Sequence, residues 1–545
     1  MEKEAPSRPS PNFAAKKIME NSIETAPSQA SGLELLARAR ECWMRAARFR
    51  ADRDRCKRFT YGDQWSDYTE VGNGVRLSEE EQLRIQGNMP LKNNLIRRLV
   101  RNVLGVFRNR WQPPVPLPRD PSEAAEAATL KRLIEYNLEL NRLEEVYARS
   151  MEEFLISGLA VHKKWFGRRG NISDCWTDIV PSDRFFWDSE ARDIRGWDMN
   201  LVGEIHEMEF SRLCASFSRT PADRERIARI YGVDFRNPPR SLKCELTEIW
   251  LREHSPRWYC HDRMHGRRFE VEEADYRRLV EQENARRLST IGENALLIDA
   301  RWMMSDQWRY FFISPSGDII DSGVSPYQHG SHPYIIKAYP FIDAEIHSFV
   351  SDVIDQQKLT NRLITMYDWI LRASAKGVLL FPEGALPDGC DMNEIAEEWS
   401  RFNGVIIYKA RAGVPIPQQV SSNSTNIGIT GLLEIQMKMM EDISGVNGAL
   451  QGKLDSNSMS GTLYNQQTQN SLTALADLMR SFEDFIGQGV EMDIANIRQF
   501  YTPRRIAAIT GSHPGLATTL RPARDFFHTP FDIRINGRTV ATTAT

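Results

Sequence analysis

The sequence of 545 residues has no run of about 18 apolar residues, so it predicts no transmembrane helix. Its first 30 residues are polar and rich in proline and serine, without the apolar core of a signal peptide. It contains only seven cysteines, an odd number scattered from Cys42 to Cys390. This argues against a disulfide framework and for a reducing compartment. We therefore expect a protein that folds in the cytoplasm and does not enter a membrane.

Neither sign of charge is in excess, because 70 basic residues oppose 73 acidic ones and the formal net charge is −3. A protein that gripped nucleic acid over its whole surface would usually be basic, so tight wrapping of DNA is disfavoured. A conduit through which DNA slides would instead suit a near-neutral lining. Apolar and charged contents of 41% and 26% are ordinary for a soluble globular protein. The length predicts two to four domains or a multi-part subunit.

Motifs for catalysis and metal binding are also lacking. The stretch from Gly448 to Leu454 resembles a phosphate-binding loop but has one residue too few between its glycines, and it ends in Leu454 where a Ser or Thr would bind magnesium. Four side chains that can bind metals lie close together at a spacing that matches no standard zinc site: His254, Cys260, His261 and His265. Neither G-x-S-x-G nor H-E-x-x-H occurs. We predict no enzyme activity, cofactor or metal.

Apolar periodicity predicts an α+β fold in which helices and short strands alternate. Helices are expected at 33–58, 91–109, 122–157, 210–230, 272–287, 345–372, 427–443 and 462–500. Strands are expected at 160–165, 176–180, 184–187, 245–253, 308–314, 378–381 and 405–408. Pro315 to Asp318 carries the residues of a hairpin turn.

The helix predicted from Glu345 to Arg372 has two distinct faces. Its apolar face is the candidate packing surface and comprises Ile346, Val350, Val353, Ile354, Leu363, Met366 and Ile370. Its polar face carries Asp352, Asp355, Lys358 and Arg362. Periodicity alone would also fit a core helix of an unrelated α+β protein.

Several stretches, taken in order, point to a known family. Phe59 to Trp65 reads Phe-Thr-Tyr-Gly-Asp-Gln-Trp, and an Asn-rich basic helix follows it at 93–109. Three further stretches are Asp178 to Asp188, Ser325 to Tyr334, and Ser444 to Gly461. The long helix holds Gln356, Gln357 and Asn361. Their order over about 59–500 resembles that of the portal proteins, or head–tail connectors, of short-tailed double-stranded DNA bacteriophages.

This resemblance implies a portal fold with a wing, a helical stem, an α/β clip and a small or absent crown, assembled as a dodecameric ring. Its regions would be a flexible arm at 1–32, the wing at 33–205, stem helices at 206–235 and 345–375, the clip at 240–340, wing strands at 376–410, a candidate tunnel loop at 411–426, and an inner helix, further wing and reduced crown at 427–545. Channel-facing candidates are the polar residues of the long helix together with Gln418, Gln419, Ser421, Ser422, Asn423 and Asn426. A surface loop without function fits 411–426 equally well.

The function that the resemblance implies is a conduit at one capsid vertex for genome packaging and ejection. The partners would be the major capsid protein, terminase, a head-completion or tail adaptor protein, and the double-stranded DNA that passes through. The protein would be assembled in the host bacterial cytoplasm and reside in the virion. The arginine-rich segments 45–58 and 97–110 would contact packaged DNA or another head protein, or else pair with acidic surfaces of neighbouring copies.

Two other classes of function remain open from the sequence. One is a nucleic-acid enzyme such as a nuclease or terminase subunit, against which the missing nucleotide-binding motif argues. The other is a different structural head–tail protein, such as an adaptor or scaffold component. Chain length and the α/β insertion between two helices favour a portal over an adaptor.

Overall fold

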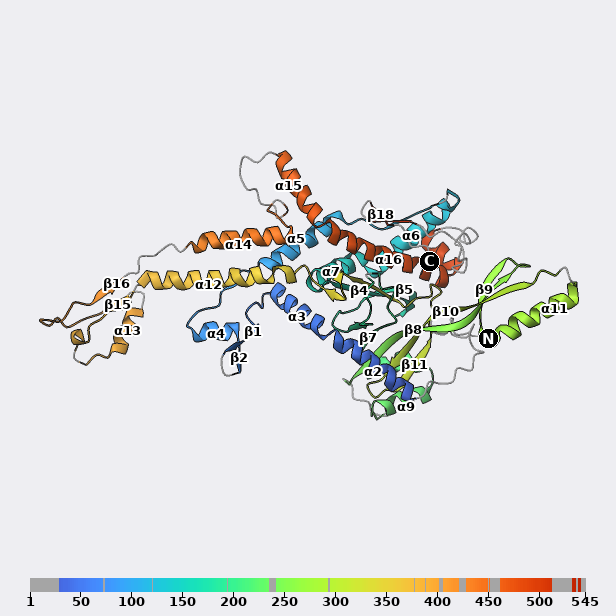
Figure 1. Ribbon diagram of the computed structural model, residues 1–545, viewed down its shortest axis with the longest axis horizontal. Coiled ribbons are helices and arrows are strands. Elements are labelled where there is room, and N and C mark those ends of the chain that lie inside the picture. The colour runs from blue at the N-terminus through green and yellow to red at the C-terminus, as the bar shows by residue number, and fades with distance from the viewer. Residues whose placement is uncertain are drawn as a thin grey trace, which may run out of the picture. The chain divides into compact units, whose positions relative to one another are not determined.

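The computed structural model describes the greater part of the chain. The described residues are 29–71, 74–119, 121–193, 195–234, 242–292, 295–376, 378–387, 389–400, 405–420, 428–448, 450, 461–511, 532–535 and 538–540. The chain divides into two compact units (Figure 1). The first comprises Met1–Asp54, Leu104–Ser348 and Leu475–Thr545, and the second Arg55–Val103 and Phe349–Ala474. The division falls within helices α3 (Ala47–Tyr61) and α5 (Leu95–Arg110).

Antiparallel sheets form the framework of the first unit. The largest runs in the order β11-β10-β8-β7-β6, with β9 paired to β8, and the others are β12-β4-β5, β18-β17-β3 and the hairpin β13-β14. The strands are β3 (Val115–Leu117), β4 (Leu159–Arg169), β5 (Ile172–Ile179), β6 (Phe185–Trp187), β7 (Leu201–Glu209), β8 (Lys243–Asp262), β9 (Arg267–Glu272), β10 (Ile298–Ile313), β11 (Ile319–Val324), β12 (Tyr334–Ala338), β13 (Phe341–Ile342), β14 (Glu345–Ile346), β17 (Asp532–Ile535) and β18 (Arg538–Val540). Every strand pairing among the described residues is antiparallel, as an α+β fold requires.

Helices cover these sheets. They are α2 (Gln29–Arg45), α6 (Ala124–Asn141), α7 (Leu143–Ser157), α8 (Phe210–Phe217), α9 (Pro221–Ile230), α10 (Glu273–Tyr276), α11 (Gln282–Ile291), α16 (Ala476–Phe500) and α17 (Pro503–Thr510), with short turns η1 (Pro121–Glu123) and η2 (Arg277–Glu281). Helix α16 packs on β4 and β12. Its apolar residues Phe482, Phe485 and Ile486 recur at helical spacing and are fully buried, so they form the core beneath the helix.

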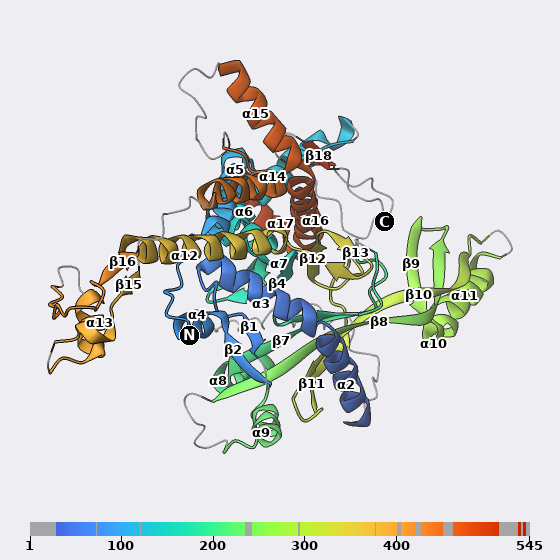
Figure 2. The ribbon, with the colours of Figure 1, turned by 60° about the vertical axis from the view of Figure 1, so that its left-hand side comes forward.

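The second unit is built around two long helices. Helices α12 (Ile354–Lys376) and α14 (Ile429–Ser444) pack against each other, and they lie side by side in Figures 1 and 2. The remaining elements are β1 (Tyr68–Val71), β2 (Val75–Ser78), α4 (Glu79–Ile85), η3 (Ser351–Val353), β15 (Val378–Leu380), η4 (Glu383–Ala385), α13 (Met392–Ser400), β16 (Gln418–Val420) and α15 (Gly461–Ala474). The chain between α12 and α14 therefore contains a two-stranded β15-β16 sheet and a helix.

Most of the predicted elements are present, but several bounds differ. The strands predicted at 245–253 and 308–314 are parts of the much longer β8 and β10, which pair from Ile298 opposite Asp262 to Ile313 opposite Thr247. The helix predicted at 210–230 is two short helices, because Pro221 begins a second helix behind the Thr220 cap. The prediction of a strand at 405–408 is wrong, since these residues form no regular structure. Gln418 and Gln419 lie in strand β16 rather than in a loop.

Candidate functional site: helix α12 and its polar junction

The long helix begins nine residues later than periodicity predicted. Glu345 and Ile346 form strand β14, which pairs with β13 across the turn at Asp343 and Ala344. A short 3₁₀ turn at Ser351–Val353 leads into α12 at Ile354. The apolar residues before Ile354 therefore belong to a strand and a turn, even though their spacing matches a helix.

The candidate packing residues differ in exposure. Val350, Val353, Ile354 and Leu363 are buried, whereas Ile346 and Ile370 are partly exposed and Met366 is half exposed. The candidate packing residues from Val350 to Leu363 are thus buried within the second unit, and those farther along the helix are more exposed. Helix α14 packs against α12, and the 206–235 segment, predicted as the other stem helix, belongs to the first unit. Its predicted pairing with the long helix stays a prediction.

The cations of the predicted polar face are held in ion pairs. Lys358 Nζ lies 2.7 Å from Glu79 Oε1 and 3.0 Å from Asp67 Oδ2. Arg362 reaches the same Glu79 carboxylate at 3.2 Å. Burial opposes ionisation of Asp67, but Lys358 and Arg55 outweigh it and hold the pKa of Asp67 below its ordinary value. Lys358 is therefore part of an ion cluster, while Asp352 and Asp355 are exposed.

Two buried amides of α12 form a polar junction with the start of α5. Gln357 Oε1 accepts the backbone N–H groups of Leu95 (2.9 Å) and Ile96 (3.3 Å), and its Nε2 donates to the carbonyl of Asn93 (2.7 Å) and to Asn361 Oδ1 (2.9 Å). Asn361 Oδ1 also accepts the N–H of Asn93 at 3.1 Å. The first N–H groups of a helix have no partner inside it, so Gln357 supplies an acceptor for Ile96 and a second one for Leu95, which also donates to the carbonyl of Asn93 at 2.9 Å.

The Phe59 to Trp65 stretch enters the same junction. Asn361 Nδ2 donates to Gln64 Oε1 at 2.7 Å, and Gln64 Nε2 donates to the carbonyl of Phe59 at 2.9 Å. Trp65 Nε1 donates to the carbonyl of Leu91 at 3.1 Å, while Gly62 takes a φ of +99° that a residue with a Cβ rarely adopts. Gln64 and Asn361, which are 297 residues apart in the sequence, thus belong to one buried network.

Among the described residues, the other sequence candidates do not come together in one site. Ser421, Ser422, Asn423 and Asn426, and most of Gly448 to Leu454, lie outside the described residues. His254 pairs with Asp306 and His265 with Asp262, at 2.7 and 2.8 Å. Cys260 is fully buried in a small apolar cluster. His254, Cys260 and His265 therefore have separate surroundings.

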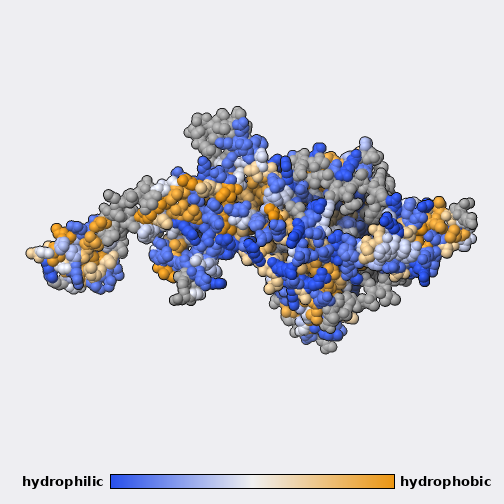
Figure 3. Space-filling model, viewed as in Figure 1, coloured by the Kyte–Doolittle hydropathy of each residue, from blue (hydrophilic) through white to orange (hydrophobic). Residues whose placement is uncertain are grey.

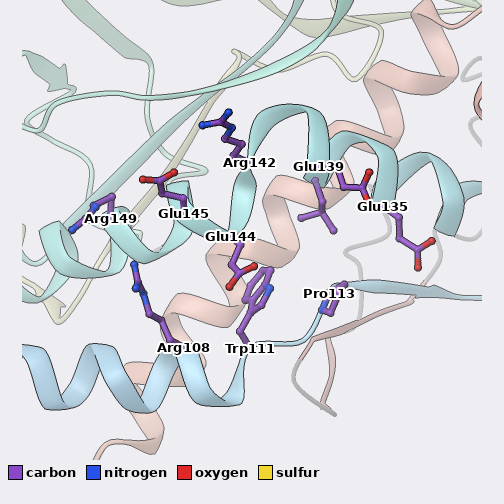
Figure 4. A pocket seen from close by; sticks show the side chains of 10 residues that line it. Arg108, Trp111, Pro113, Glu135, Glu139, Arg142, Glu144, Glu145 and Arg149 are labelled. Atoms are coloured by element: carbon purple, nitrogen blue, oxygen red, sulfur yellow. The ribbon is translucent and has the colours of Figure 1, made fainter.

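An open cleft of about 790 Å³ lies in the first unit, between α6, α7 and the end of α5 (Figure 4). Its wall carries Trp111 and both signs of charge, including Arg108, Arg142, Glu139 and Glu144. This mixture of guanidinium and carboxylate groups suits contact with a protein surface better than a small-molecule site, which is usually mostly apolar.

Comparison with known families decides the identity. A model of the phage P22-like portal protein family matches residues 36–520. The chain belongs to this family. No curated protein matched the chain in a separate search. Among the helices described, none is long and apolar enough to cross a membrane.

Membership of the P22-like portal family confirms the resemblance and the portal role that it implied. The chain is a portal protein, the head–tail connector of a bacteriophage virion, with a role in genome packaging. The family is structural and non-enzymatic, and it assembles as a ring with capsid, terminase and DNA as its partners. The mixed helical and antiparallel structure fits the α+β class.

Proposed function

We propose that this portal protein forms a dodecameric ring at one capsid vertex, that DNA passes through its centre in packaging and ejection, and that terminase and then a head-completion or tail adaptor protein dock on it. Assembly would take place in the cytoplasm of the host bacterium. Family membership supports these steps, and one feature of the second unit supports assembly directly.

That feature is an apolar surface along α14 and α12. On α14, Leu432, Ile435, Met439 and Ile443 are between 46% and 50% exposed. Their spacing places them on one helix face. On α12, Leu359, Met366 and Trp369 are between 41% and 54% exposed. Figure 3 shows apolar side chains gathered over α14. A contiguous apolar surface of this kind is typical of a protein interface, and a neighbouring copy in a ring would cover it.

We also propose a revised position for the stem and the clip. The resemblance implies an α/β clip between two stem helices. Helices α12 and α14 pack together, and the β15-β16 sheet and α13 lie between them in the chain. This order supports α12 and α14 as the stem and 378–420 as the clip, in place of 206–235 and 240–340. Asp352, Asp355, Gln418 and Gln419, which are exposed, remain the channel-facing candidates among the described residues.

The test is assembly of the purified chain, viewed by negative-stain electron microscopy. Rings with a central hole of about 20 Å or more would admit duplex DNA. Ile435→Asp places a charge in the apolar surface without touching the buried core, so we expect it to abolish ring formation while circular dichroism stays unchanged. Lys438→Asp, at an exposed polar position of the same helix, is the control and should assemble.

Monomers or compact dimers of the natural chain at every concentration would overturn the proposal of a ring. Normal rings from Ile435→Asp would instead show that α14 is not at the interface. Ile354 is unsuitable for this test because it is 2% exposed in the single chain, so a charge there would unfold the unit.

A further inference from the structure

Three metal-ligating side chains lie on one face of the largest sheet in the first unit: Glu204 and His206 on β7, and Glu248 on β8. Residues two apart on a strand share a face, and the strand register places Glu204 opposite Glu248. One ligand atom from each side chain lies within 4.8 Å of the other two. His206 Nε2 is 2.7 Å from Glu248 Oε2, and His206 Nδ1 is 3.7 Å from Glu204 Oε1.

Both carboxylates are buried. Glu248 is 1% exposed and Glu204 is 9% exposed. Within the described part of the chain, the one ion pair of Glu204 is with His206. Burial raises the pKa of Glu204, His206 and Lys163 oppose this rise, and the neighbouring Glu248 adds to it. The two buried carboxylates lie opposite each other on neighbouring strands, and a cation placed between them would reduce their mutual repulsion.

The donor set and the spacing suit a transition metal. Zinc binds imidazole nitrogen and carboxylate oxygen at about 2.0–2.2 Å, so tetrahedral geometry separates its ligand atoms by about 3.4 Å. The two glutamates contact different ring nitrogens of His206, so a metal would use one nitrogen together with one oxygen from each carboxylate. Three such atoms lie within 4.8 Å of one another, and rotation of the side chains would bring them to the zinc separation. Magnesium and calcium prefer sites in which every ligand atom is oxygen, so the imidazole nitrogen of a histidine disfavours them.

Lys163 on β4 is the group that opposes a metal here. Its ammonium pairs with Glu248 Oε2 and lies 5.3 Å from the centre of the Tyr334 ring. Trp250 Nε1 donates to the other oxygen of Glu248 at 2.8 Å. A histidine that binds a metal is neutral, so in the metal-binding state the two carboxylates and one ammonium carry a single negative charge. The lysine and a divalent cation would therefore compete for Glu248. Removing the lysine should then strengthen metal binding.

We propose that Glu204, His206 and Glu248 form a structural site for a divalent transition metal of the zinc class. The metal clamps β7 to β8 through side chains, in addition to their backbone hydrogen bonds.

The test is calorimetric titration of the untagged, chelator-treated full-length protein with zinc chloride, together with thermal unfolding. We expect one zinc per chain and a higher midpoint of unfolding with zinc than with chelator. His206→Ala and Glu204→Gln should each weaken binding at least about tenfold, because each removes a ligand. Lys163→Met should tighten binding, because it removes the competing charge. Magnesium chloride should not bind at this site.

Two variants serve as matched controls. His265→Ala removes another histidine that pairs with a carboxylate, and Glu207→Gln removes a glutamate from the other face of β7. Both should bind zinc as the natural protein does. Absence of zinc binding would overturn the proposal, and so would equal binding by His206→Ala and Glu204→Gln. Weaker binding by Lys163→Met would show that the lysine supports the carboxylates rather than competing with a metal. That result would overturn the proposal as well.

Discussion

Gln357 illustrates how a single residue gains its importance from residues far away in the chain. It is fully buried, and its side-chain amide makes four hydrogen bonds, three of them to backbone groups at Asn93, Leu95 and Ile96. Its neighbour Gln356 is only partly buried. The sequence shows both as interruptions of an apolar stripe, but which of the two faces inward depends on the start of the helix.

We predict that Gln357→Ala destabilises the second unit by about 1–3 kcal/mol, because it leaves the N–H of Ile96 without this acceptor and removes one hydrogen bond each from Asn93, Leu95 and Asn361. Thermal unfolding and amide hydrogen exchange of the purified protein would measure this, with faster exchange at the N–H groups of Leu95 and Ile96. Gln356→Ala is the matched control and should cost less than about 0.5 kcal/mol. Equal losses of stability in the two variants would contradict the role of Gln357 in the polar junction.

At the scale of elements, the turn between β13 and β14 decides where α12 begins. Asp343 and Ala344 have φ values of 52° and 65°, in the left-handed region. Two-residue hairpins of this kind usually contain Asn-Gly or Asp-Gly, so Asp-Ala is a weak signal for a turn. Periodicity therefore extended the helix back through the strand. A hairpin is stabilised by hydrogen bonds between its two strands, and the spacing of apolar residues gives no information about those bonds.

We predict that Ala344→Gly stabilises the first unit by about 0.5–1 kcal/mol, because glycine adopts a positive φ without steric cost. The midpoint of urea unfolding would measure the gain. Ala51→Gly, at an exposed position inside α3, should instead lower stability by about 1 kcal/mol. If Ala344→Gly lowered stability as much as Ala51→Gly, the left-handed backbone conformation of residue 344 would be contradicted.

At the scale of the whole molecule, charge balance bears on how DNA would move. The net charge is −3, and Lys358, which the sequence placed on the polar face of the long helix, is bound by Asp67 and Glu79. A cation that is paired with carboxylates contributes little to phosphate binding. The proposed channel would therefore hold DNA weakly, as sliding requires.

We predict that assembled rings bind a short DNA duplex weakly, with an affinity that falls only gently as salt increases. Lys358→Gln should leave the slope of log affinity against log salt unchanged, although it should lower the stability of the second unit. Fluorescence anisotropy over a range of salt concentrations would measure the slope. A slope reduced by about one would mean that Lys358 contacts a phosphate.

The sequence by itself determined the portal family, the α+β class, and nearly all the helices, because ordered motifs and apolar periodicity are local properties of a chain. It also identified Gln64, Gln357 and Asn361 as members of motifs. Only the tertiary structure decided that these three meet, that α12 pairs with α14, and that Lys358 lies among acids. Each of these facts is a contact between distant segments, and such contacts depend on how the whole chain packs.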